Sequence, residues 1–231
     1  MATVILLRHA RSTANGAGVL AGRRPGVRLS DRGEEQAAAL VARLAGVPLA
    51  AVVTSPLERC RHTLAPLLAD RGLDPVVEDD LAEVDYGEWT GREIKELLSE
   101  PLWSVVQQHP SAAVFPGGEG LAAVQSRAVA AIRAHDARIT AEHGPRAVWL
   151  ACSHGDVIKA VLADALGVHL DGFQRIVVDP ASVSVVQYTE TRPFVHRVND
   201  NGGDLLGLVP PPEKTDDPPS SDAVVGGTTG A

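Results

Sequence analysis

The sequence is poor in aromatic and sulfur-containing side chains. Only 3% of its 231 residues are aromatic, and its two cysteines are Cys60 and Cys152. So few aromatic rings leave little for stacking on nucleic acid bases, and the net charge of −8 repels phosphate backbones. We therefore expect no nucleic acid partner. Two cysteines within apolar segments form neither a disulfide framework nor a metal cluster, so we expect reduced, buried thiols.

Long apolar runs and export signals are also lacking. No segment approaches the ~20 apolar residues that a membrane-spanning helix needs. The chain runs from Met1 directly into the apolar segment 3–7 and then into charged residues, with no basic region or cleavage site of a signal peptide. We therefore expect a soluble, cytoplasmic protein with no membrane partner.

Composition and length favour one folded domain followed by a tail. Hydrophobic residues make up 45% of the chain, mostly Ala, Val and Leu, which suits buried strands covered by helices. From Pro210 onward the sequence reads PPPEKTDDPPSSDAVVGGTTGA, which offers almost nothing that can pack. The prediction is one domain over residues 1–209 and a disordered, Pro/Gly-rich tail over 210–231.

Apolar runs that are typical of strands alternate with helical patterns along the domain. The predicted strands include residues 4–7, 51–54, 75–78 and 147–152, and the longest predicted helix spans 121–143. This alternation is typical of an α/β fold: a single three-layer domain with a mainly parallel mixed sheet and helices on both faces.

The last two predicted strands differ from the others. Residues 182–188 and 194–198 alternate between apolar and polar side chains, which indicates antiparallel strands at one edge of the sheet. An edge strand near 183–188 would be available for pairing in a homodimer.

Unusual polar sets follow three of the predicted strands. Arg8, His9 and Arg11 follow the first, Ser55 to Arg59 follow the second, and Ser153-His154-Gly155 follow the third. Ligands of open α/β sheets bind beyond the carboxyl ends of the strands, so these groups should meet in one crevice. Cations packed together repel and lose solvation, so the cluster makes physical sense around a multiply charged anion. Phosphate is the natural candidate, because the arginine fork bonds two phosphoryl oxygens at once.

Histidine can attack phosphorus while neutral, provided that its second ring nitrogen is held by an acceptor. His9 is placed for that task, and the helix that starts near Gly155 can add backbone amides to the phosphate site. The leaving alkoxide needs a proton, for which Glu83 and Asp85 are the candidates. We favour Glu83.

Three segments carry a resemblance to a known family. LLRHARSTAN, SPLERCRHT and ACSHG, in this order and spacing, resemble the motifs of the histidine phosphatase superfamily, which includes phosphoglycerate mutases and many phosphatases. The resemblance implies a phosphoglycerate mutase-like fold, a phosphorylated nucleophile at His9 and a proton donor at Glu83. It also implies a phosphate pocket made of Arg8, Arg11, Arg59 and His154, with Asn15 as an auxiliary phosphate contact.

Departures from the family pattern favour a phosphatase over a mutase. Ala10 follows the nucleophile where the family usually has glycine, which is the smallest change available. Val84-Asp85 stands where phosphoglycerate mutases have Arg-His, and Asp156 stands where they tend to have Asn, so a second anionic group is disfavoured. The prediction is a phosphomonoester hydrolase for a small-molecule phosphate ester, with a phosphomutase of the phosphoglycerate mutase type as the alternative.

Two expectations about conditions follow. Glu83 must hold a proton while His9 stays unprotonated, so the pH optimum should lean to the acid side. The scheme needs neither a metal nor another cofactor.

Two further functions compete with this one. Ala151-Cys152-Ser153-His154-Gly155 is similar to the nucleophile elbow of serine acyl hydrolases, with Asp179 and His196 following in triad order. This alternative leaves the three arginines unexplained. A non-catalytic sensor of a phosphorylated ligand would gain nothing from a buried acid such as Glu83 beside a bound dianion.

Overall fold

A computed structural model describes residues 2–203 of the chain, and these residues form one α/β unit around a six-stranded mixed sheet. The strand order is β3-β2-β4-β1-β5-β6, with β4 between β1 and β2. The first four strands in this order run parallel to one another, and β5 runs antiparallel to both β1 and β6. The strands are β1 (Thr3–Arg8), β2 (Leu49–Thr54), β3 (Val76–Val77), β4 (Val148–Ser153), β5 (Val183–Gln187) and β6 (Phe194–Asp200).

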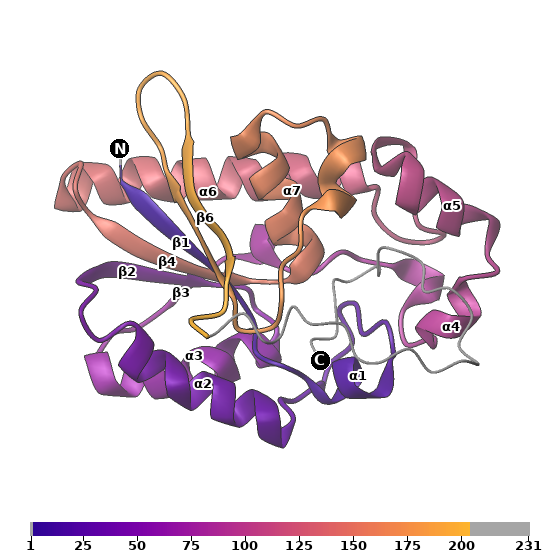
Figure 1. Cartoon of the computed structure of the whole chain (residues 1–231), viewed down its shortest axis with the longest axis horizontal. Coiled ribbons are helices and arrows are strands. Elements are labelled where there is room, and N and C mark those ends of the chain that lie inside the picture. Colours follow the sequence, from indigo (N-terminus) through magenta and orange to yellow (C-terminus); the bar gives the residue numbers. More distant parts are fainter. Residues whose placement is uncertain (1, 204–231) are drawn as a thin grey trace.

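Helices cover both faces of the sheet, as predicted. In Figure 1, α6 and α7 lie on one face and α2 and α3 on the other, while α4 and α5 lie beyond one end of the sheet. The α-helices are α1 (Thr13–Ala17), α2 (Asp31–Arg43), α3 (Glu58–Arg71), α4 (Ile94–Leu97), α5 (Pro101–Gln108), α6 (Leu121–His143) and α7 (Gly155–Leu166). Short 3-10 helices are η1 (Asp79–Leu81), η2 (Gly87–Trp89), η3 (Pro110–Ala112) and η4 (Leu170–Arg175).

The continuous apolar run of β1 is explained by burial on both faces. Val4 and Leu6 belong to the core cluster shared with α6 and α7, whereas Ile5 and Leu7 belong to the cluster shared with α2 and α3. Successive side chains of a strand point to opposite faces, so a central strand with two covered faces has no place for a polar residue before its end.

Local signals set the helix boundaries. Ser30 caps α2 by accepting a hydrogen bond from the amide of Gly33 at 3.2 Å, and Gly72 and Gly167 end α3 and α7 in the left-handed conformation. The helix predicted over residues 121–143 matches α6 at both ends. None of the helices in residues 2–203 combines the length and apolar character that crossing a membrane requires.

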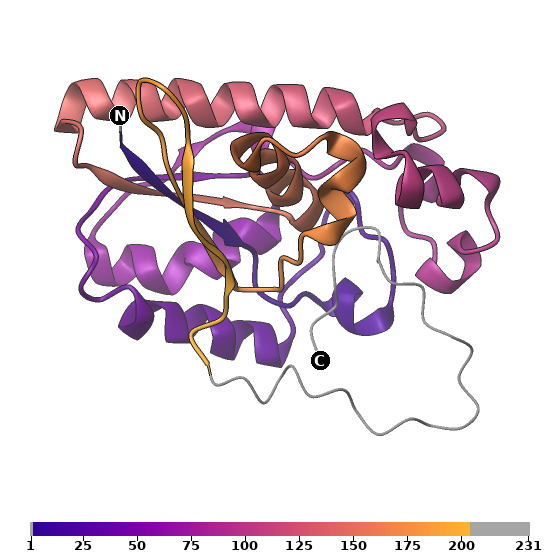
Figure 2. The same ribbon diagram turned by 45° about the horizontal axis from the view of Figure 1, so that its top comes forward.

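The prediction of an edge strand near 183–188 is wrong. β5 lies between β1 and β6, so both of its edges are paired, and the outer strands are β3 and β6. The β5–β6 hairpin rises beside β1 in both views (Figures 1 and 2). An alternating pattern indicates a half-covered strand, but it does not indicate which strand of a hairpin pairs with the rest of the sheet. The predicted tail over 210–231, together with the domain boundary at 209, lies outside the described residues.

Candidate active site

The carboxyl ends of three neighbouring parallel strands bring the predicted polar groups together. Arg8 pairs with Ser153 in the β1–β4 register, and Thr54 pairs with Cys152 in the β2–β4 register. Just beyond, the amide of His9 donates to the carbonyl of Ser153 at 2.9 Å. The three motifs therefore meet because β4 lies between β1 and β2 in the sheet.

His9 is held in one neutral tautomer. Its side chain is buried, and Nδ1 lies 2.8 Å from the backbone carbonyl of Ala10, an arrangement in which Nδ1 carries the hydrogen. The opposite ring nitrogen, Nε2, accepts a hydrogen bond from Nε of Arg59 at 3.2 Å. Burial, together with the charges of Arg59 and Arg8, holds the pKa of His9 well below its usual value. The imidazole is therefore neutral at physiological pH and has its Nε2 lone pair inside the cluster.

Arg8 and Arg59 are both buried and fixed by backbone carbonyls. Nη1 of Arg8 donates to the carbonyl of Val178 at 2.6 Å, and Nη2 of Arg59 donates to the carbonyl of Gly22 at 2.9 Å. Two guanidinium groups held in place around a neutral imidazole create a positive site for an anion without needing to reorganise.

His154 completes the cluster from the start of α7. Its ring centroid lies 5.2 Å from that of His9, and its Nε2 lies 2.7 Å from Oγ of Ser55. Nδ1 of His154 makes no hydrogen bond and lies 3.8 Å from Oε2 of Glu83. Burial and the charge of Arg59 lower the pKa of His154 well below its usual value, so this ring is neutral as well.

Glu83 is a buried carboxyl beside these groups. Its Oε2 lies 3.9 Å from Nη2 of Arg59, and its Oε1 accepts a hydrogen bond from the amide of Val84. Burial and the charge of Asp156 raise the pKa of Glu83 to about 7, against the opposing effect of Arg59. The carboxyl is thus poised to give and to take a proton near neutral pH. Asp85, the other predicted candidate, instead accepts a hydrogen bond from the amide of Gly87 within its own loop.

The other predicted site residues are Arg11, Asn15 and Gly155, and each takes part in a local backbone or helix-start arrangement. The backbone of Arg11 is fixed by Gln36 and Ser30. Oδ1 of Asn15 accepts hydrogen bonds from the amide and the hydroxyl of Ser12 at the start of α1, so a phosphate contact would be left to its Nδ2. Gly155 begins α7, whose first amides point beyond the helix end as in any helix.

Several contributions were not predicted from the sequence. Ser55 bonds the ring of His154, although the sequence indicated only that Ser55 follows a strand. Asp156, fully buried, accepts a hydrogen bond from the hydroxyl of Tyr86 at 2.8 Å and lies 3.5 Å from Nζ of Lys159. A carboxylate followed by Lys three residues later is an ordinary helical pair, so the sequence held no signal that Asp156 would influence Glu83.

The serine hydrolase triad is not assembled. Oγ of Ser153 donates to the carbonyl of Leu81 at 2.8 Å. His196 is exposed on β6, which is separated from β4 by β1 and β5, and its ring bonds Gln187. Asp179 accepts a hydrogen bond from the side chain of Asn199. Ser153 is therefore a buried structural residue.

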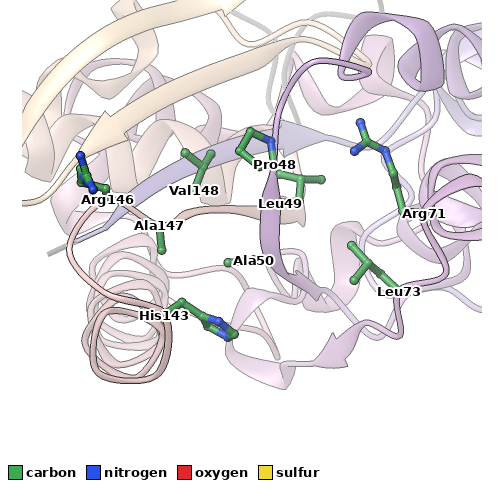
Figure 3. A pocket seen from close by; sticks show the side chains of 9 residues that line it. All are labelled: Pro48, Leu49, Ala50, Arg71, Leu73, His143, Arg146, Ala147 and Val148. Atoms are coloured by element: carbon green, nitrogen blue, oxygen red, sulfur yellow. The ribbon is translucent and has the colours of Figure 1, made fainter.

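A cavity lies at the opposite end of the sheet, where β2 and β4 begin (Figure 3). This cavity of about 560 Å³ is lined by Leu49, Val148, Arg71 and His143 among others, and by none of the strand-end residues described above. Within residues 2–203, no three His, Cys, Asp or Glu side chains are grouped as a metal ion would require.

Known proteins resemble this chain in both sequence and fold. Residues 4–201 match the family model of the histidine phosphatase superfamily, branch 1. The chain is 31% identical over 202 residues to phosphoserine phosphatase 1 of Hydrogenobacter thermophilus, covering 86% of this chain and 92% of that one. It is 30% identical over 190 residues to the adenosylcobalamin/α-ribazole phosphatase of Escherichia coli, covering 80% and 89%. The solved α-ribazole phosphatase of Shigella flexneri superposes with a TM-score of 0.74 at 27% identity, covering 86% of this chain and 96% of that one.

Buried arginines and histidines lie at the carboxyl ends of the parallel strands in a three-layer α/β domain. This arrangement is typical of enzymes that bind an anionic substrate. The chain belongs to the histidine phosphatase superfamily, within the phosphoglycerate mutase-like fold. Its enzyme class is that of a phosphoric monoester hydrolase, as the motifs predict.

Proposed function

We propose that the protein hydrolyses small-molecule phosphate monoesters through a phosphohistidine intermediate on His9. The observation that supports this most directly is the His9 ring itself, with Nδ1 on the carbonyl of Ala10 and Nε2 facing Arg59. This arrangement presents a neutral nucleophile beside a cation that binds and activates the phosphoryl group.

In the first step, the hydrogen bond from Nε of Arg59 shifts from Nε2 of His9 to a phosphoryl oxygen, the freed Nε2 lone pair attacks phosphorus, and the bond to the ester oxygen breaks. Arg8, Arg11, Arg59 and His154, with Asn15 and the amide of Gly155, hold the phosphoryl oxygens. Because the alkoxide leaves as a strong base, the protonated carboxyl of Glu83 gives it a proton. The phosphoimidazole keeps its Nδ1 hydrogen bond to the carbonyl of Ala10.

In the second step, the carboxylate of Glu83 takes a proton from water as the water oxygen attacks phosphorus. The phosphorus–nitrogen bond breaks, inorganic phosphate leaves, and both His9 and Glu83 return to their starting protonation states. The scheme uses no metal or other cofactor, so we expect activity to persist in EDTA.

A hydrolase is favoured over a phosphomutase by the positions that differ from the mutase pattern. Val84 is fully buried in the core, and Oδ1 of Asp85 is used by the amide of Gly87. Neither position offers a cation for a second anionic group of the substrate. The relatives named after phosphoserine and α-ribazole support a small phosphate ester as substrate. A cytoplasmic location stays a prediction.

Trapping the intermediate tests the proposal. A phosphomonoester labelled with ³²P is mixed with the enzyme and quenched in alkali within one turnover. We expect label on the wild-type protein that is stable in alkali and released by acid, as for a phosphorus–nitrogen bond. His9→Ala should lose the label and the activity, while His62→Ala, which changes an exposed histidine on α3, should keep both. Acid-stable label, or label that persists in His9→Ala, would overturn the proposal.

A further inference from the structure

Glu83 lies in an irregular segment between η1 and η2, so no regular element fixes its main chain. A proton donor must nevertheless stay within hydrogen-bond reach of the leaving oxygen. The carbonyl of Glu83 accepts hydrogen bonds from two guanidinium groups, namely Nε of Arg23 at 2.8 Å and Nη2 of Arg127 at 3.3 Å. These arginines come from the loop before α2 and from the first turns of α6.

A single carboxylate aligns the two arginines. The carboxylate of Glu119 accepts hydrogen bonds from Nε and Nη2 of Arg127 at 2.9 and 3.0 Å, and from Nη2 of Arg23 at 2.9 Å. The same carboxylate accepts from the amide of Asp85 at 2.9 Å. Burial alone would raise the pKa of Glu119, but the bonds from Arg127 and Asp85 hold it below its usual value, so the group is ionised.

Arg127 extends this contact to the start of the loop, where its Nη1 donates to the carbonyl of Asp80 at 2.5 Å. The loop is thus held at Asp80, at Glu83 and at Asp85 by one connected set of charges. A bidentate arginine–carboxylate pair fixes the orientation of both side chains and also stabilises the fold. Because Arg127 lies on a helix, it holds the loop more rigidly than a contact from another loop would.

We propose that Arg23, Arg127 and Glu119, here called the carbonyl clamp, are positioning residues that keep the carboxyl of Glu83 at the leaving-group oxygen. This inference depends on the proposed function, because it assigns the clamp to the proton transfer in that reaction. The clamp bonds the carbonyl of Glu83 and not its carboxyl, so in this assignment it acts through the main chain of Glu83.

Substrates with different leaving groups distinguish a misplaced proton donor from a general loss of active-site structure. An aliphatic alcohol leaves as a strongly basic alkoxide and needs a proton, whereas p-nitrophenolate leaves readily without one. We therefore expect Arg127→Met to lower kcat for phosphoserine by about 10- to 100-fold but for p-nitrophenyl phosphate by less than about 3-fold. Arg127→Lys keeps the charge and loses the fork, so it should resemble Arg127→Met.

Matched variants keep the test decisive. Arg133→Met removes another α6 arginine, one that pairs with Asp164 at 2.8 Å, and should leave both rates unchanged. Should Arg127→Met fold poorly, Arg23→Met changes a side chain that is 38% exposed and should show the same selective loss. Equal losses on the two esters in Arg127→Met and Arg23→Met would overturn the clamp. Failure of the wild-type enzyme to hydrolyse either ester would instead overturn the proposed function.

Discussion

At the scale of residues, the site depends on two groups whose environments move their pKa values in opposite directions. Burial and neighbouring arginines lower the pKa of His9, while burial and the charge of Asp156 raise the pKa of Glu83 to about 7. His9, the proposed nucleophile, is therefore neutral while Glu83, the proposed acid, still holds its proton, up to about pH 7. Separated pKa values of this kind fit the proposed roles of nucleophile and acid.

This separation predicts the pH profile. While His9 stays neutral, the rate should be highest below the pKa of Glu83 and should fall as pH rises through about 7, because the proton for the leaving group is lost. Steady-state kcat/KM for an alkyl phosphate over pH 4–9 measures this limb. Glu83→Gln should remove the limb and lower kcat by about 10²- to 10⁴-fold.

Glu88→Gln, which changes an exposed carboxyl in the same loop, should leave the profile intact. In the substrate complex the bound dianion adds negative charge beside Glu83, so the limb of kcat should lie at higher pH than that of kcat/KM. A wild-type rate that climbs steadily to pH 9 would reject Glu83 as the acid.

At the scale of elements, the loop that bears Glu83 is hydrogen-bonded through its backbone to the segment 114–120. At Gly118 the two backbones lie so close that there is no space for a side chain. The amide of Glu88 donates to Pro116 and the amide of Glu119 donates to Asp85. A Cβ atom on Gly118 would lie 2.3 Å from the carbonyl oxygen of Asp85, which is a backbone atom that cannot turn away. The glycine is therefore a packing requirement of the site.

Gly118→Ala should accordingly lower the free energy of unfolding by at least about 2 kcal/mol and reduce turnover of alkyl phosphates. Chemical denaturation with matched kinetics measures both effects. Gly46→Ala is the control, because a Cβ atom there meets nothing within 4 Å, and it should change stability by less than about 0.5 kcal/mol. Equal stability of the two variants would contradict the packing argument.

At the scale of the whole molecule, a chain of net charge −8 concentrates buried cations at one end of its sheet. Arg8 and Arg59 are buried in the same site, so both guanidinium groups lose solvation. Burying two cations in this way lowers the stability of the folded state. A bound anion restores the lost interactions, so phosphate should bind the native state and stabilise the entire domain.

Thermal unfolding tests this linkage. Phosphate at about 100 times its Kd should add about 2.7 kcal/mol and raise the Tm by several degrees relative to chloride at equal ionic strength. Arg59→Met should lose the shift, whereas Arg61→Met, an exposed position on the same helix, should keep it. An unchanged Tm in phosphate would contradict an anion site at this end of the sheet.

Local patterns were sufficient to predict much of the fold and the members of the site. Apolar runs and caps indicated the strands and the exact span of α6, because these signals act within a few residues. The polar sets after three strands predicted the meeting of His9, Arg59 and His154, because parallel strands end at the same edge of a sheet.

Only the tertiary structure decided the rest. The position of β5 inside the sheet depends on which strand of the hairpin pairs with β1, and both strands alternate alike. The hydrogen bond from Arg127 to the carbonyl of Glu83 joins residues 44 positions apart, and no local pattern predicts it. Charge, burial and distance between such segments exist only after folding, so the sequence determines which groups are available and the packing determines what each group does.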